Sequence, residues 1–322
     1  MLAMSRLGAS TWGATFARAR QIYTSVVRPA ITYGASVWHQ RGKGGKLAEN
    51  EKRLEKLQNN ALRNITGAFK RVSTETLEAE AYIPPIHITL DRLQDRSTLR
   101  LRETGMEQEI DRTCEEIRTK LSLITRLPKA TPGSRKREAL NKALEEGRDI
   151  TVGSQHRHSA RPRAQRSPRK DIDAYHHARW EKRWETYKNK HPRATRTLAQ
   201  EADLSKRTLS LRVGLRKAES TLATHIRTER IGLRVYLSAR KVPGFDSAAC
   251  PCGWNRQTAK HMLIHCPLWE VQRDRAFQTT TNMDYRKMVS TASGLKSAAR
   301  MLMETGLLSQ FSMARTLLYG EV

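Results

Sequence analysis

Hydrophobic residues recur along most of the chain at the three- and four-residue spacing of an α-helix. Leu54, Leu57, Ala61, Leu62 and Ile65 follow this spacing, and the stretch ENEKRLEK supplies the charged face of the same segment. A stripe of this kind predicts a helix that packs one side against a core. The same pattern predicts helical segments at 11–39 with an interruption at Pro29, from about Ile88 to Thr104, at 172–190, at 211–226 and at 284–318. The sequence therefore predicts a mainly α-helical fold.

Helix ends and changes in composition divide the chain. Gly67 follows the apolar stripe and is a suitable C-cap, and Pro84–Pro85 breaks the chain before the next helix. We expect five regions: a helical region at 1–105, a partly helical and then disordered basic linker at 106–174, a helical region at 175–245, a small cysteine-containing module at 246–275 and a helical tail at 276–322.

The linker contains the stretch TVGSQHRHSARPRAQRSPRK at 151–170, which has six Lys or Arg residues and no acidic residue. Its apolar side chains are too few to offset the entropy lost on folding, so the sequence predicts disorder. Two interpretations stay open, a soluble spacer and an arm that binds polyphosphate.

An aromatic face is expected on the helix that follows the linker. Trp180, Trp184 and Tyr187 lie at helical spacing. This arrangement favours burial in a core over a platform for stacking nucleobases.

The charge of the chain points to its partners. Lys and Arg total 59 against 32 Asp and Glu, for a formal net charge of +27. A surplus of this size must be balanced by anions, and nucleic acid phosphate is a better match than an anionic membrane. No apolar run approaches the length of a membrane span, and the N-terminus lacks the apolar core of a secretory signal. We expect an intracellular protein of nucleus or cytoplasm that binds RNA or DNA.

Three of the four cysteines stand close together in the stretch CPCGWNRQTAKHMLIHC at 250–266. Cys250, Cys252, His261 and Cys266 form the pattern C-x-C-x8-H-x4-C, and three thiolates and one imidazole are typical tetrahedral zinc ligands. Four ligands with no open position predict a structural Zn²⁺ that supplies folding energy. His265 competes with His261, but its position beside Cys266 would strain the backbone if both were ligands.

This motif, with its following proline, resembles the C-terminal CCHC module of fungal non-LTR (LINE-like) retrotransposon reverse transcriptases. The resemblance extends to LRKAESTLATHIRTERIGLRVYL at 215–237 and VPG at 242–244. In the N-terminal third, GASTWG, RQIYTSVVRPAITYGASVW and LEKLQNNALRNITGAFKRVSTETLEAEAYIPPI resemble the segment that follows the polymerase palm. The resemblance covers roughly 1–105 and 175–275. It implies a thumb-like helical region joined to a zinc-bearing tail.

The catalytic residues of such enzymes are not in this sequence. A polymerase of this kind needs paired aspartates to hold two metal ions, and the chain contains no Asp-Asp pair. The nearest pair is Asp171 and Asp173 in DID, without a palm around it. The carboxylates of an RNase H domain are also not found in their usual place. We therefore expect a fragment that binds nucleic acid without sequence specificity and does not polymerise or cleave it.

Basic residues in and before the zinc module are the expected phosphate contacts. They are Arg227, Arg230, Arg234, Arg256 and Lys260. Trp254, within the module, has two interpretations: it stacks on a base, or it closes a small core around the metal.

The sequence leaves two other interpretations of the whole chain open. The stretch LAQEADLSKRTLSLRVGLRKA at 198–218 resembles a helix-turn-helix, which would indicate a sequence-specific DNA-binding regulator, although Asp203 stands in the turn where glycine is commoner. The chain is also consistent with an element remnant that has no selected activity.

Overall fold

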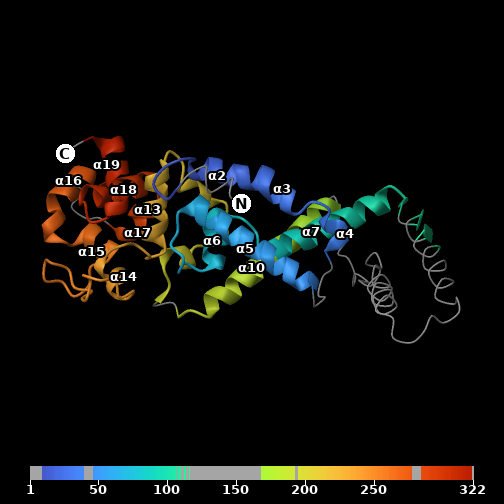
Figure 1. Cartoon of the computed structure of the whole chain (residues 1–322), viewed down its shortest axis with the longest axis horizontal. Helices are drawn as coiled ribbons and strands as arrows, with labels where there is room; N and C mark the ends of the chain where they lie inside the picture. The colour runs from blue at the N-terminus through green and yellow to red at the C-terminus, as the bar shows by residue number, and fades with distance from the viewer. Residues whose placement is uncertain are drawn as a thin grey trace, which may run out of the picture. The chain divides into compact units, whose positions relative to one another are not determined.

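The computed structural model describes residues 9–39, 46–106, 168–192, 195–277 and 284–320, with residues 108, 109, 112, 113 and 116. Across these residues the regular elements are helices and no β-strand is present (Figure 1), which confirms the mainly α-helical fold. None of the helices in the described parts of the chain is both long and apolar enough to cross a membrane. The stretch predicted to be disordered, 151–170, lies outside the described residues as far as 167. For residues 168–170 the prediction is wrong, because Pro168 begins a helix.

The described residues form two units, and their limits differ from the regions expected from composition. The first unit draws on Met1–Tyr33, Gln40–Thr89 and His177–Val322, and the second on Gly34–His39 and Leu90–His176. Most of the expected first region therefore shares a unit with the module and the tail. The helices α7 (Ile86–Glu103) and α10 (Pro168–Asn189) each run from one unit into the other.

The first unit begins with a nearly continuous helical segment. Thr15 caps α2 (Phe16–Ile22) by accepting a hydrogen bond from the N–H of Arg18. The interruption expected at Pro29 takes the form of a π-helical turn, η1 (Tyr23–Val27), which leads directly into α3 (Arg28–Ile31). Proline has no N–H to donate, and the wider turn lets the chain remain helical around it.

The segment packs on α5 (Lys46–Thr66) and α6 (Thr74–Ala81), which build the first core of this unit. Phe16, Tyr23, Leu62, Ile65 and Leu77 are all buried there. The predicted C-cap is confirmed. Gly67 has a φ of +70°, and its N–H donates to the carbonyl of Arg63 (2.7 Å).

The aromatic face of α10 is buried at Trp180 and Trp184, as expected, whereas Tyr187 is half-buried. Trp180 and Trp184 pack with Ala79 and Leu204, and the indole N–H of Trp184 donates to the carbonyl of Ala202 (3.1 Å). Their burial leaves no exposed ring face for stacking a base.

The stretch that resembled a helix-turn-helix is not one. Only two four-residue helices form, α11 (Leu198–Glu201) and α12 (Arg207–Ser210), and both are too short to act as a recognition helix. Thr208 and Leu204 are buried against the α6 region rather than presented outward. The helix expected at 211–226 begins only at Lys217, because Gly214 takes a left-handed φ of +73°.

The C-terminal part of the first unit forms a second core around α13 (Lys217–Arg227) and α18 (Ala292–Glu304). The predicted packing of Met288, Leu295, Met301, Leu302 and Leu308 in the tail is confirmed, whereas Leu307 is 42 % exposed. The other helices here are α14 (Arg234–Ser238), α15 (Ala259–Ile264), η3 (Pro267–Trp269), α16 (Glu270–Phe277), α17 (Tyr285–Met288), η4 (Ser309–Phe311) and α19 (Ser312–Tyr319).

Every residue of α13 is buried, including its charged ones. The carboxylate of Glu80, on α6, accepts from Arg212 (2.6 Å) and from Arg227 (2.7 Å), and all three side chains are at most 5 % exposed. Burial alone would raise the pKa of Glu80, but the charges of Arg227 and Arg212 and their hydrogen bonds lower it below its ordinary value. This ion cluster joins residues of the first unit that lie more than a hundred positions apart in the sequence.

Two more polar contacts from α13 cap the end of α5. Lys217 Nζ donates to the carbonyls of Asn64 (2.6 Å) and Ile65 (3.0 Å), and burial lowers its pKa to about 8. His225 Nε2 donates to the carbonyl of Gly67 (3.0 Å), and burial lowers its pKa to about 4. Since the last carbonyls of a helix have no partner within it, these side chains satisfy them.

In the second unit, Asp173 pairs with Arg96 (2.5 Å) and His176 pairs with Asp95 (2.8 Å). The Asp173 of the DID sequence is therefore half of an ion pair.

Replacement of Glu80 by Gln is expected to lower the free energy of unfolding by about 3–5 kcal/mol, because it leaves two buried guanidinium groups without their counter-charge. Denaturant unfolding measures this loss. The matched control is Glu49→Gln, which removes the exposed pair of Glu49 with Arg53 and should change the free energy by less than about 1 kcal/mol. Equal effects of the two changes would contradict the structural role of the cluster.

Candidate metal centre

Two tight structures hold the four ligand residues. Cys250 and Cys252 lie on a turn in which the N–H of Gly253 donates to the carbonyl of Cys250 (3.0 Å). Gly253 has a φ of +91°, a conformation that favours glycine. His261 lies on α15, where the hydroxyl of Thr258 accepts from the N–H of His261 and caps the helix. Cys266 follows α15, and its N–H donates to the carbonyl of His261 (2.9 Å).

The four side chains converge. The Sγ atoms of Cys250 and Cys266 are 3.7 Å apart, Cys252 Sγ is 3.2 Å from His261 Nε2, and all four ligand atoms lie within 4.8 Å of one another. Metal–sulfur bonds of about 2.3 Å in a tetrahedron place two sulfurs roughly 3.8 Å apart. Cys250, Cys252, His261 and Cys266 can therefore hold a metal ion such as zinc.

The electrostatics fit a cation at this place. The three thiols form no disulfide, and burial raises the pKa of Cys266 to about 12, so a thiolate there needs a compensating positive charge. Burial lowers the pKa of His261, which keeps the imidazole neutral at pH 7. His265, the competing ligand, is exposed and does not belong to the cluster.

Gln257 was not identified from the sequence, although it connects the cluster to the next element. It is buried, its Nε2 donates to Cys250 Sγ (3.9 Å), and its Oε1 accepts from the N–H of Arg234 at the start of α14 (3.1 Å). Hydrogen bonds to ligand sulfurs orient them. No hydropathy pattern marks a single buried glutamine, so only the three-dimensional contact reveals it.

Arg273 was also missed. Its Nη1 donates to the carbonyls of Cys266 (3.0 Å) and Met262 (3.4 Å), which closes the end of α15. The module also packs on the second core of the first unit, because that core includes Cys250, Met262, Leu263 and Cys266 together with residues of α13 and α18.

Trp254 combines features of both interpretations that the sequence left open. Its ring stacks on His261, with centroids 5.5 Å apart and planes 8° from parallel, yet the residue is 57 % exposed. One ring face lies on a ligand of the cluster, and exposed ring surface stays available for a base.

The structure separates the expected phosphate contacts. Arg230, Arg256 and Lys260 are exposed, and all three charges act on the carboxyl of Glu229, so they lie near one another. Arg234 is half-buried, with its guanidinium 5.9 Å from the Phe245 ring. The prediction that Arg227 contacts phosphate is wrong. Its side chain is buried in the ion cluster with Glu80, so its guanidinium is not available to phosphate.

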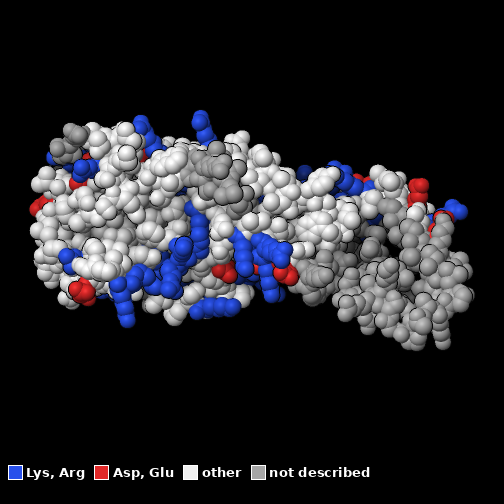
Figure 2. Space-filling view, viewed as in Figure 1, with Lys and Arg blue, Asp and Glu red and all other residues white. Residues whose placement is uncertain are grey.

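On the face shown in Figure 2, basic side chains extend over the part where α14, α5 and α10 lie in Figure 1, with few acidic side chains between them.

Comparison of the chain with protein-family models, with curated proteins and with solved structures found no match.

The full chain is expected to bind one Co²⁺ with an absorption band from thiolate-to-metal charge transfer. His261→Asn should weaken this binding by more than about ten-fold, since even the loss of an outer hydrogen bond to a ligand costs that much. The control is His265→Asn, which should bind Co²⁺ like the unchanged chain. The assignment of the ligands is wrong if the two variants behave alike or if His265→Asn is the weaker one.

Proposed function

We propose that this chain binds nucleic acid, without sequence specificity, through a surface that a structural zinc ion organises. The observation that carries the proposal is the position of Trp254, Arg256 and Lys260 between two ligands of the cluster, Cys252 and His261. Ligation of a metal by those two residues closes the short loop on which the aromatic ring and the two charges lie. Zinc with four protein ligands supplies folding energy and leaves no position for a substrate.

Phosphate binding is the role of the exposed cations. The charges of Arg230, which follows α13, and of Arg256 and Lys260 on the module all act on the carboxyl of Glu229, and Gln257 fixes the module to the start of α14 at Arg234. Three exposed cations and the half-buried Arg234 supply positive charges that the phosphates of a nucleic acid backbone can pair with. The net charge of +27 adds a long-range attraction.

Base stacking is the role of Trp254. Its ring is supported on one side by His261, so a base that stacks on it meets a rigid surface. Stacking tolerates any base and needs an unpaired strand. The site therefore favours single-stranded RNA or DNA over duplex.

The resemblance to non-LTR retrotransposon reverse transcriptases gives this proposal a context. In this interpretation the chain is a thumb-like region with a zinc-bearing tail, which grips nucleic acid inside the cell. The sequence has no Asp-Asp pair, and Asp173 is engaged with Arg96. We accordingly propose a binding protein and not a polymerase. Nothing in the short helices α11 and α12 favours the alternative of a sequence-specific regulator.

Salt dependence tests the phosphate contacts. For the double variant Arg256→Ala/Lys260→Ala, we expect weaker binding of an oligonucleotide duplex. The slope of log affinity against log salt should also be smaller in magnitude by about 1.8, because each lost phosphate contact removes about 0.9 from the slope. The control, Lys287→Ala/Lys296→Ala, removes two exposed charges outside the module and should leave the slope unchanged. Equal slopes in all three proteins would exclude Arg256 and Lys260 from the interface.

A second test concerns the ring. Trp254→Ala should weaken binding of single-stranded oligonucleotide by about 1–3 kcal/mol and duplex binding by much less. Trp12→Ala is a matched control, because Trp12 is 59 % exposed and lies outside the module; it should leave both affinities unchanged. A loss in Trp254→Ala that is equal for single strand and duplex would argue against stacking.

A further inference from the structure

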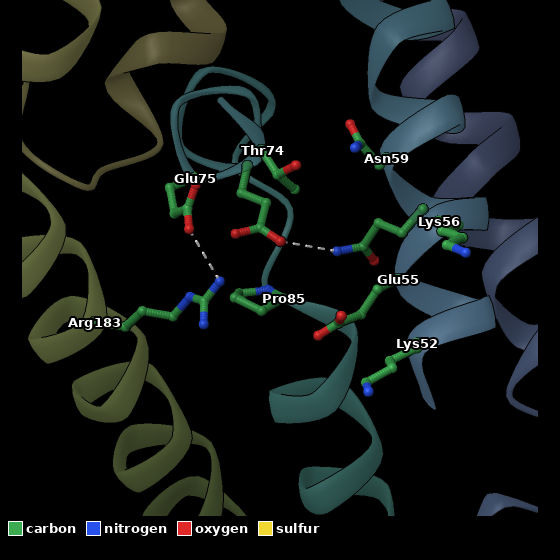
Figure 3. Close-up of a pocket in the computed structure, with 10 residues that line it drawn as sticks. Lys52, Glu55, Lys56, Asn59, Thr74, Glu75, Pro85 and Arg183 are labelled. Atoms are coloured by element: carbon green, nitrogen blue, oxygen red, sulfur yellow. Dashed lines mark hydrogen bonds and ion pairs between the residues drawn. The ribbon is translucent and has the colours of Figure 1, made fainter. Parts of the chain in front are cut away.

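The basic side chains of the first unit differ in how far nearby carboxylates balance them. In the polar pocket between α5, α6 and α10, Figure 3 shows Arg183 directed at Glu75, and the two side chains form an ion pair (3.4 Å). Glu55 lines the same pocket, together with two lysines of α5. These cations therefore lie among carboxylates, which weakens their attraction for an external phosphate.

The turn that joins α5 to α6 carries cations of a different kind. The N–H of Val72 donates to the carbonyl of Phe69 (3.1 Å), so Lys70 and Arg71 are the two central residues of a tight turn, and both are exposed. Neither of their side chains has a charged or hydrogen-bonding partner among the described residues. The surrounding stretch 63–74 contains no acidic residue. The charge of this turn is therefore not balanced locally.

The turn is held in one position by contacts on both of its sides. Arg63 donates to the carbonyls of Phe69 (2.5 Å) and Val72 (2.9 Å). The ring of Phe69 stacks on His225, with centroids 4.3 Å apart, and on Tyr236 of α14, with centroids 5.2 Å apart. Since its backbone is already ordered, the turn loses little conformational freedom when its two cations bind a ligand.

The end of α14 brings two more cations to the same place. The guanidinium carbon of Arg240 lies 5.7 Å from the centroid of the Tyr236 ring, the ring on which Phe69 also stacks. Lys241 follows directly, and both basic residues are exposed. The stretch 230–245 contains no acidic residue. One aromatic ring therefore joins the basic turn to the basic end of α14.

The same short helix connects the turn with the metal module. Gln257 of the module accepts from the N–H of Arg234 at the start of α14, and Tyr236, two residues further on, contacts Phe69 of the turn. The five residues of α14 are about 8 Å long at 1.5 Å per residue. This is the length of about two to three nucleotides at the 3.4 Å spacing of one strand.

From these contacts, we propose that Lys70, Arg71, Arg240 and Lys241 form a second phosphate-binding surface, the α14 surface, which holds the same single strand that Trp254 stacks on. The inference rests on the proposed function, because it adds contacts to the strand bound at the module. Among the described residues none of the four basic side chains is in an ion pair. Contacts of cations with phosphates are independent of base sequence, so the α14 surface lengthens the binding site without making it specific.

The first experiment measures the affinity of the zinc-loaded full chain for a single strand of oligouridine by fluorescence anisotropy at several salt concentrations. A strand of about 20 nucleotides is longer than the roughly 4–16 nucleotides that one single-strand site covers. The variant Lys70→Gln/Arg71→Gln/Lys241→Gly should bind this strand at least about ten-fold more weakly. The slope of log affinity against log salt should be smaller in magnitude by about 2, because each phosphate contact to a single strand contributes about 0.7.

The matched control is Arg275→Gln/Lys287→Gln/Lys296→Gln, which removes the same net charge from exposed residues of α16, α17 and α18. It should keep the affinity and the slope of the unchanged chain, because only the long-range attraction is reduced. The inference is wrong if the two triple variants behave alike. If Arg256→Ala/Lys260→Ala weakens binding and the α14 variant does not, the inference fails while the proposed function stands. Both fail if the unchanged chain does not bind the strand.

Stoichiometry shows whether the two surfaces hold one strand. A titration at low salt, with the chain well above its dissociation constant, should saturate at no more than one oligonucleotide per chain. Saturation at two oligonucleotides per chain would show that the α14 surface binds a strand of its own, which would contradict the inference.

Two properties of the variants separate lost phosphate contacts from lost structure. Lys241 has a φ of +53°, a conformation that favours glycine, so Lys241→Gly removes the charge without adding backbone strain. Thermal unfolding of the α14 variant should therefore match that of the unchanged chain. The exchanged variant Lys70→Arg/Arg71→Lys keeps both charges of the turn and should keep the affinity, since either cation can contact a phosphate. A loss of about ten-fold in the exchanged variant would show that the turn acts through its shape and not its charge, and would overturn the inference.

Discussion

The buried carboxylate of Glu80 is the interaction on which the first unit depends. It is paired with Arg212 and Arg227, and all three side chains are at most 5 % exposed. Separating any of the three leaves an unpaired charge in the core, which is far more costly than losing a surface ion pair. Since Glu80 lies on α6 and Arg227 at the end of α13, the N-terminal helices and the C-terminal half must fold as one body. Lys217 and His225 of α13 also connect these two parts of the chain, because they donate hydrogen bonds to carbonyls at the end of α5.

The position of the metal module follows from that connection. Residue Arg227 ends α13, and the core of α13 and α18 includes Cys250, Met262 and Cys266. The module therefore rests on an already fixed helix, while Gln257 ties it to α14. Trp254 and the cations Arg256 and Lys260 are exposed on the module, so the binding surface that we propose would depend on the small ligand cluster.

The sequence predicted what depends on local spacing. Helical periodicity indicated the all-helical fold, the cap at Gly67 and the buried face of Trp180 and Trp184. Chemistry and spacing together indicated the four ligands, because residues 250–266 form a self-contained loop. Long-range pairing could not be predicted this way. Arg227 looks like any basic residue in a basic segment, and only its contact with Glu80, 147 positions away, shows that it is buried. The role of Gln257 likewise depends on contacts that no local pattern records.

The decisive property is the dependence of nucleic acid binding on the metal. The measurement is the affinity of the full chain for one single-stranded RNA at fixed salt. It is made in the zinc-loaded state, after removal of the metal by a chelator, and after zinc is restored, with Cys252→Ser measured beside it. We expect the affinity to fall on chelation, to return with zinc, and to be low in Cys252→Ser throughout. An unchanged affinity after chelation and in Cys252→Ser would show that the basic surface binds without the metal centre, and the proposed role of zinc would be wrong.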